Sequence, residues 1–119
     1  MKEYDLEERT LTFSRKLIKF LKKVPKTVIT IPLIDQGLRA GTSMGANYRE
    51  ANGASSRKDF LNKVFICKKE AKETLYWLDL IGNAVDEEDL KKEGRELWLE
   101  TKELMLIFGK IAGSPKATL

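Results

Sequence analysis

The sequence predicts an all-α protein, an up-down-up-down antiparallel four-helix bundle. Three observations support this fold class. Apolar residues recur at helical spacing in four segments, the connections between segments are short, and no sustained period-two run is bounded by hairpin turns. A chain of 119 residues suits one domain with one core, so residues 1–119 are expected to form a single domain.

The first two helices are expected at residues 6–24 and 30–52. Asp5 followed by Glu8 resembles a capping box at the start of the first, and Pro25 ends it. The first core stripe is predicted to comprise Leu6, Thr10, Phe13, Leu17, Phe20, Leu21 and Val24. The predicted apolar face of the second helix comprises Ile31, Ile34, Leu38, Gly41, Gly45 and Tyr48.

The third and fourth helices are expected at residues 56–82 and 86–112, with Ser56 and Asp86 as capping residues. The third stripe is predicted to comprise Phe60, Val64, Cys67, Ala71, Thr74, Leu75 and Leu78. The fourth is predicted to comprise Leu90, Gly94, Leu97, Thr101, Leu104, Phe108 and Ile111. Four amphipathic helices with short connections favour the antiparallel bundle.

The stretch "RAGTSMGANYREANGAS" (residues 39–55) is rich in small residues. Each glycine in a helix interior costs about 1 kcal/mol relative to alanine, which favours a loop. The apolar periodicity nevertheless continues through it, so we expect a helix with a shallow groove that Phe60 or Trp77 can fill. The groove residues are predicted to be Gly41, Ser43, Gly45 and Ala46. A phosphate-binding loop is disfavoured because no GxxxxGK[ST] motif and no preceding strand occur.

The chain contains no histidine, which removes histidine-based acid–base catalysis and ordinary zinc sites. We therefore expect no enzyme activity, no catalytic residues, no metal and no cofactor, although a carboxylate-only metal site stays open. Cys67 is predicted to be a buried core residue, and Trp77 and Trp98 to be packing residues. A lone cysteine and the absence of an apolar signal segment or membrane-length run predict a cytoplasmic protein without a membrane partner.

The net charge of +4 is unevenly distributed. Residues 9–26 hold seven basic and no acidic residues, whereas residues 73–104 hold ten acidic and four basic ones. Such asymmetry indicates a surface for a polyanion or for a charged protein partner, the alternative being an ordinary solvated surface. The predicted nucleic-acid contacts are Arg15, Lys16, Lys19, Lys22 and Lys23 on the first helix, helped by Arg57, Lys58 and Lys72.

Two further residue sets follow from helical spacing. Glu70 and Glu73 flank the third core stripe, where an unpaired carboxylate is costly, so structural pairing with the second helix is expected. The set for this pairing is Arg39, Asn47, Arg49, Glu50, Glu70 and Glu73. Apolar residues away from the core stripes predict a subunit contact, through Leu11, Ile18, Phe65, Tyr76, Leu80, Leu99 and Leu106.

The motifs "GANYREA" and "SRKDFLNKVFICKKEAKETLYWLDLI" resemble those of the bacterial 23S rRNA intervening-sequence protein family, also called the S23 or four-helix-bundle family. A related branch is the accessory variability determinant of diversity-generating retroelements. The resemblance implies a short four-helix chain that assembles into a ring-like homopentamer and carries no catalytic motif. Its partners would be structured RNA or an RNA-bound protein. The alternatives are a protein-interaction module without RNA contact and an accessory subunit of a retroelement reverse transcriptase.

Overall fold

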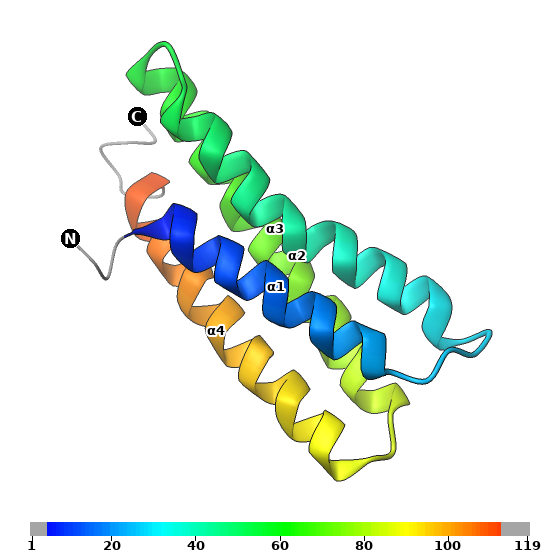
Figure 1. Cartoon of the computed structure of the whole chain (residues 1–119). Helices are drawn as coiled ribbons and strands as arrows, with labels where there is room; N and C mark the ends of the chain where they lie inside the picture. Colours follow the sequence, from blue (N-terminus) through cyan, green and yellow to red (C-terminus); the bar gives the residue numbers. More distant parts are fainter. Residues whose placement is uncertain (1–4, 113–119) are drawn as a thin grey trace.

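The computed structural model describes residues 5–112 and contains four helices, α1 (Leu6–Lys23), α2 (Thr30–Asn52), α3 (Arg57–Ala84) and α4 (Glu88–Ala112). Successive helices reverse direction at short turns, so the chain forms an antiparallel four-helix bundle (Figure 1). No strand occurs among the described residues. The helix ends differ from the expected positions by at most two residues.

Side-chain caps start two of the helices where expected. The Asp5 carboxylate accepts a hydrogen bond from the Glu8 amide at 3.2 Å, and the Ser56 hydroxyl accepts one from the Asp59 amide at 3.0 Å. The start of α4 differs from the prediction. The carbonyl oxygen of Glu87 accepts from the Lys91 amide at 3.0 Å, so Glu87 rather than Asp86 holds the capping position.

The core lies between the four helices, all of which contribute buried side chains. Phe13, Leu17 and Phe20 of α1 are fully buried there, together with Met44 of α2, Val64 of α3 and Leu104 of α4. Three threonines are also buried in this core, namely Thr10, Thr74 and Thr101. Each hydroxyl donates to the carbonyl oxygen four residues earlier, at 2.6 to 2.8 Å, so no buried polar group among them is left unsatisfied.

The predicted apolar face of α2 was correct only in part: Gly41 is buried and Ile34 and Tyr48 pack against the core, but two other residues do not. Ile31 and Leu38 keep 48% and 38% of their surface exposed, whereas Ala40 and Met44 are completely buried. Small residues hold the core positions because α2 lies close to its neighbours, and the larger aliphatic residues lie toward the outside. The hydrophobic pattern alone therefore placed Ile31 and Leu38 wrongly and missed Ala40 and Met44.

The small-residue groove of α2 receives α1. A Cβ atom built on Gly45 would lie 2.9 Å from the Thr10 hydroxyl, and one on Gly41 would overlap the side chain of Leu17. The prediction that Phe60 or Trp77 fills this groove was therefore wrong, although Trp77 approaches Gly37 further along α2. The close approach of α1 to α2 requires glycine at both contact positions.

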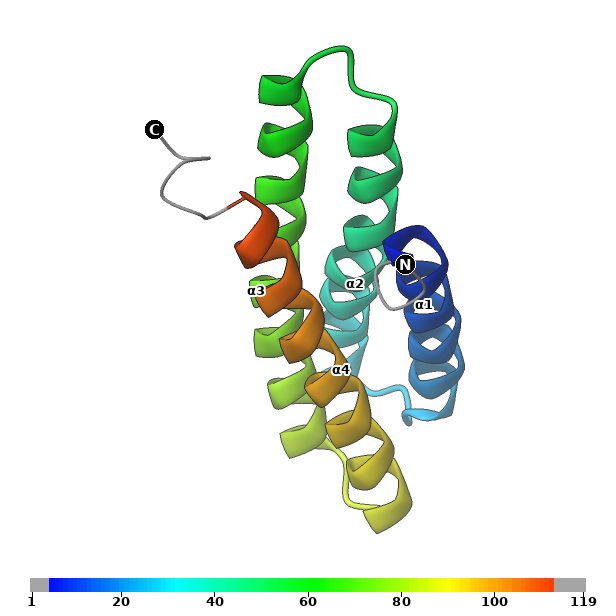
Figure 2. The same cartoon turned by 90° about the vertical axis from the view of Figure 1, so that its left-hand side faces the viewer.

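The four helices contribute unequally to the bundle. At 28 residues, or about 42 Å, α3 is the longest and packs extensively on both α2 and α4. The shorter α1 lies beside the middle of the α2–α3 hairpin and makes fewer contacts with α4 than with α2 (Figure 2). The α1–α4 seam is consequently the loosest contact between neighbouring helices.

Candidate nucleic-acid interface

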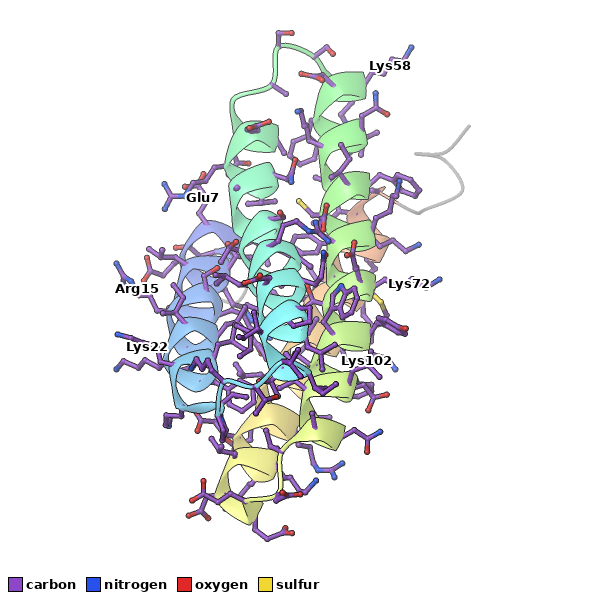
Figure 3. The ribbon with its side chains drawn as sticks, turned by 90° about the vertical axis from the view of Figure 1, so that its right-hand side faces the viewer. Glu7, Arg15, Lys22, Lys58, Lys72 and Lys102 are labelled. Atoms are coloured by element: carbon purple, nitrogen blue, oxygen red, sulfur yellow. The ribbon has the colours of Figure 1, made fainter. Side chains whose placement is uncertain are left out.

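The predicted basic residues lie on more than one side of the bundle. Arg15 and Lys22 project from α1, whereas Lys72 projects from α3 on the opposite side and Lys58 lies near the α2–α3 turn (Figure 3). The Arg57 guanidinium also lies near this turn, 5.5 Å from the centre of the Phe60 ring. The eight residues therefore do not form one continuous basic face.

Acidic residues of α4 oppose the basic residues of α1. The Arg9 guanidinium donates to both carboxylate oxygens of Glu100, at 2.7 and 3.0 Å, and to Glu103 at 2.7 Å. Hydrogen bonding to Glu100 raises the pKa of Arg9 further. The Lys23 ammonium donates to Glu93 at 2.8 Å. Part of the positive charge of α1 therefore serves to hold α1 on α4.

A groove of about 710 Å³ follows this seam. Its charged lining includes Lys16, Lys19 and Lys23 from α1 and Glu93, Glu96 and Glu100 from α4. A phosphate chain entering the groove would meet carboxylates as well as lysines. Of the five basic residues predicted on α1, only Arg15 and Lys22 lie outside the groove lining.

The outward side of α3 carries a different arrangement. Six residues follow the spacing i, i+4, i+7, i+11, i+14 and i+18, which places them on one helix face, and all six are exposed. We call this set the α3 stripe: Lys58, Asn62, Phe65, Lys69, Lys72 and Tyr76. Within residues 5–112, none of its lysines takes part in an ion pair. Lys69 was missed in the sequence, although its spacing from Phe65 and Lys72 identifies it.

Two carboxylates of α3, Glu70 and Glu73, lie on its α2 flank. Arg39 of α2 pairs with Glu70 at 3.4 Å and with Glu73, and the Trp77 indole nitrogen donates to Glu73 at 2.9 Å. This cluster joins α2 to α3, with the Arg39 guanidinium shared between the two carboxylates. Its role is structural.

The other residues predicted to pair behave differently. The Asn47 amide donates to the Ser43 carbonyl at 2.9 Å within α2, so its predicted pairing with α3 was wrong. Arg49 lies 3.9 Å from Glu7 of α1, on the other flank of α2. Glu50 accepts from Lys63 of α3 at 2.8 Å, and this hydrogen bond raises the pKa of Lys63.

The residues predicted for a subunit contact lie on three surfaces. Five are exposed, namely Ile18, Phe65, Tyr76, Leu99 and Leu106, while Leu11 and Leu80 are half-buried. Ile18 is exposed on α1, and Ile31 and Leu38, which the sequence assigned to the core, are exposed on α2. Leu99 and Leu106 lie seven residues apart on the outer side of α4.

Chemical groups that could serve other functions are few in the described chain. Cys67 is fully buried, its thiol lies 3.4 Å from the Met44 carbonyl oxygen, and burial raises the pKa of the thiol to about 12. Within residues 5–112, no group of three potential metal-ligand residues gathers closely enough to hold a metal ion. None of the described helices is both long and apolar enough to cross a membrane.

These features define a helical bundle with charged and apolar outer surfaces. The family profile described as 23S rRNA-intervening sequence protein matches residues 2–105, and the chain belongs to this family. It is similar to a crystal structure of a protein of unknown function from the S23 ribosomal protein family of Bacteroides thetaiotaomicron. The identity is 32% and the TM-score 0.75, covering 91% of this chain and 98% of that chain. No curated protein matches significantly.

Proposed function

We propose that this protein is a non-enzymatic homo-oligomer that binds structured RNA, or an RNA–protein complex, through an exposed basic surface in the cytoplasm. The separation of charge on α3 carries the proposal. Lysines occupy outward positions, whereas Glu70 and Glu73 of the same helix lie on its α2 flank and pair with Arg39 of α2. Exposed lysines attract a phosphate backbone by releasing its counterions. The family description, which refers to 23S rRNA, supports an RNA partner.

The proposed assembly is a homopentameric ring, the stoichiometry that the family resemblance implies. Exposed apolar residues on separate helices support it, with Ile18 on α1, Leu38 on α2, and Leu99 and Leu106 on α4. A cyclic ring uses two different surfaces of each subunit, and exposed apolar residues on separate helices are compatible with this. Light scattering of the purified protein at micromolar concentration should give a mass of several chains, and a monomer would contradict the assembly.

The RNA-binding proposal is tested by the salt dependence of affinity. Fluorescence anisotropy with a labelled RNA hairpin carrying a single-stranded loop should show affinity falling by at least roughly tenfold between about 50 and 200 mM KCl, as phosphate contacts require. An acidic protein of similar size serves as the control for nonspecific adsorption. Absence of RNA binding at the lower salt concentration would overturn the proposal.

A protein-interaction module is the second candidate function. The observation that favours it is the turn between α1 and α2, where Val28 and Ile29 keep 84% and 63% of their surface exposed. Adjacent exposed aliphatic residues are typical of protein contacts. A reverse transcriptase or an RNA-bound protein are partners of this kind. If the protein binds no RNA, this turn is where substitutions should abolish partner binding.

A further inference from the structure

We propose that the α3 stripe binds a single-stranded segment of RNA, with bases stacked on Phe65 and Tyr76 and phosphates held by the neighbouring lysines. The inference rests on the proposed RNA-binding function and assigns to it one surface and one form of RNA. It also moves Phe65 and Tyr76 from the predicted subunit contact to the RNA interface.

The two aromatic residues have no packing role that explains their position. Phe65 and Tyr76 keep 47% and 58% of their surface exposed on a helix whose opposite side supplies the core. Tyr76 meets Trp77 edge-on, with ring centres 4.9 Å apart, and this contact restrains its ring. Exposed aromatic rings provide stacking surfaces for bases of any sequence.

The lysines lie at positions from which they can contact the phosphates that join the stacked bases. Lys69 and Lys72 lie between the two rings along α3, and Lys58 extends the row toward the α2–α3 turn. At 1.5 Å per residue the rings are separated by about 16 Å along the helix, and the whole stripe is about 27 Å long. A backbone running along the stripe would therefore alternate between aromatic and cationic contacts, the combination found in single-strand binding proteins.

The local charge favours this surface over α1. Along α3 from Lys58 to Tyr76, the carboxylates lie off the stripe, and Glu70 and Glu73 are paired with Arg39. The first exposed carboxylate in line with the stripe is Asp79, beyond Tyr76. The lysines of the α1–α4 groove face three glutamates instead. From Lys58 to Tyr76, the charged side chains on the α3 stripe itself are all lysines.

Two arguments select single-stranded RNA as the occupant. The bases of a duplex are already stacked on one another, so only unpaired bases can stack on side chains of a helix surface. A second copy of the chain is disfavoured because it would bury exposed lysines, which needs matching carboxylates. Three carboxylates of α4 that could supply them, Glu93, Glu100 and Glu103, are engaged with α1.

The experiment compares substitutions on α3 with matched substitutions on α1. The probes are a labelled oligouridine of about 12 nucleotides and a blunt RNA duplex of the same length. Phe65→Leu with Tyr76→Leu keeps apolar side chains but removes the stacking surfaces. Lys69→Ala with Lys72→Ala removes two charges from the stripe. Arg15→Ala with Lys22→Ala removes two charges from the opposite side of the bundle.

We expect the aromatic double variant to bind oligouridine at least roughly tenfold more weakly, with unchanged circular dichroism and unchanged mass in solution. The lysine pair should reduce the salt slope by about 1.4, at about 0.7 per phosphate contact, while the α1 pair leaves it unchanged. Wild-type protein should prefer oligouridine to the duplex.

Three results would overturn the inference while leaving RNA binding itself intact. These are unchanged affinity in the aromatic variant, loss of binding only in the α1 pair, and equal binding of duplex and oligouridine. A smaller mass of the aromatic variant in solution would instead assign the stripe to a subunit contact and also overturn it. Failure of the wild-type protein to bind any RNA would overturn the proposed function itself.

Discussion

Both α1 and α3 carry several basic residues, but the structure surrounds the basic residues of the two helices with different numbers of carboxylates. On α1, Arg9 and Lys23 form ion pairs with α4, and Lys16 and Lys19 face further carboxylates across a groove. On α3, the stripe lysines are exposed and the nearby carboxylates are engaged with Arg39. Positive charge therefore holds the bundle together on one helix and is available to a ligand on the other.

This difference follows from how each helix is attached. α3 packs extensively on both of its neighbours, so its outward-facing side chains are not needed to hold it in the bundle. α1 is short and approaches α4 loosely, so it depends on glycine contacts with α2 and on ion pairs with α4. Substitutions at the helix contacts and on the α3 stripe can therefore show which residues hold α1 in the bundle and which are free to contact a ligand.

The largest effect is expected at the α1–α2 contact. Gly45→Leu should lower the free energy of unfolding by about 1–3 kcal/mol, because a side chain there meets Thr10 at under 3 Å and pushes α1 away. Urea unfolding followed by circular dichroism measures this change. Gly82→Leu on α3 is the control, since a Cβ at that position has no neighbour within 4 Å. Equal unfolding midpoints for the two variants would mean that α1 does not depend on the glycine contact.

An intermediate effect is expected in the α1–α4 seam. Arg9→Ala removes a two-pronged contact with Glu100 and one with Glu103, and should cost about 1 kcal/mol of unfolding free energy in low salt. Lys23→Ala, which removes one more exposed ion pair, should cost less than about 0.5 kcal/mol. Thermal unfolding in low and high salt measures both. A loss in Arg9→Ala that persists undiminished in high salt would show that packing, not charge, holds this seam.

The smallest effect is expected on the α3 stripe. Lys69→Ala with Lys72→Ala should change the unfolding free energy by less than about 0.5 kcal/mol, because neither residue takes part in an ion pair within the described chain. Urea unfolding beside the wild-type protein measures the difference. A loss comparable with that of Arg9→Ala would show that the stripe lysines stabilise the bundle, and the contrast with α1 would disappear.

Some contacts of the candidate site could be predicted from the sequence, and others could not. Helical spacing correctly suggested that Arg39 lies near Glu70 and Glu73, since each residue flanks a core stripe. It failed for Asn47, whose amide finds a closer acceptor within its own helix. It also treated Lys19 and Lys22 alike, although only Lys19 lines the α1–α4 groove, because a helical wheel gives directions around one helix and contains no information about the charges on the next.

The sequence by itself determined the helices and most of the core. Caps at Asp5 and Ser56 and long apolar stripes on α1, α3 and α4 are local patterns, so they specify local structure before any packing occurs. Tertiary structure decided the face of α2, where Met44 is buried and Ile31 is exposed. It also decided which lysines face carboxylates. Both depend on how closely neighbouring helices approach, and that distance is set by residues far apart in the chain, such as Gly45 and Thr10.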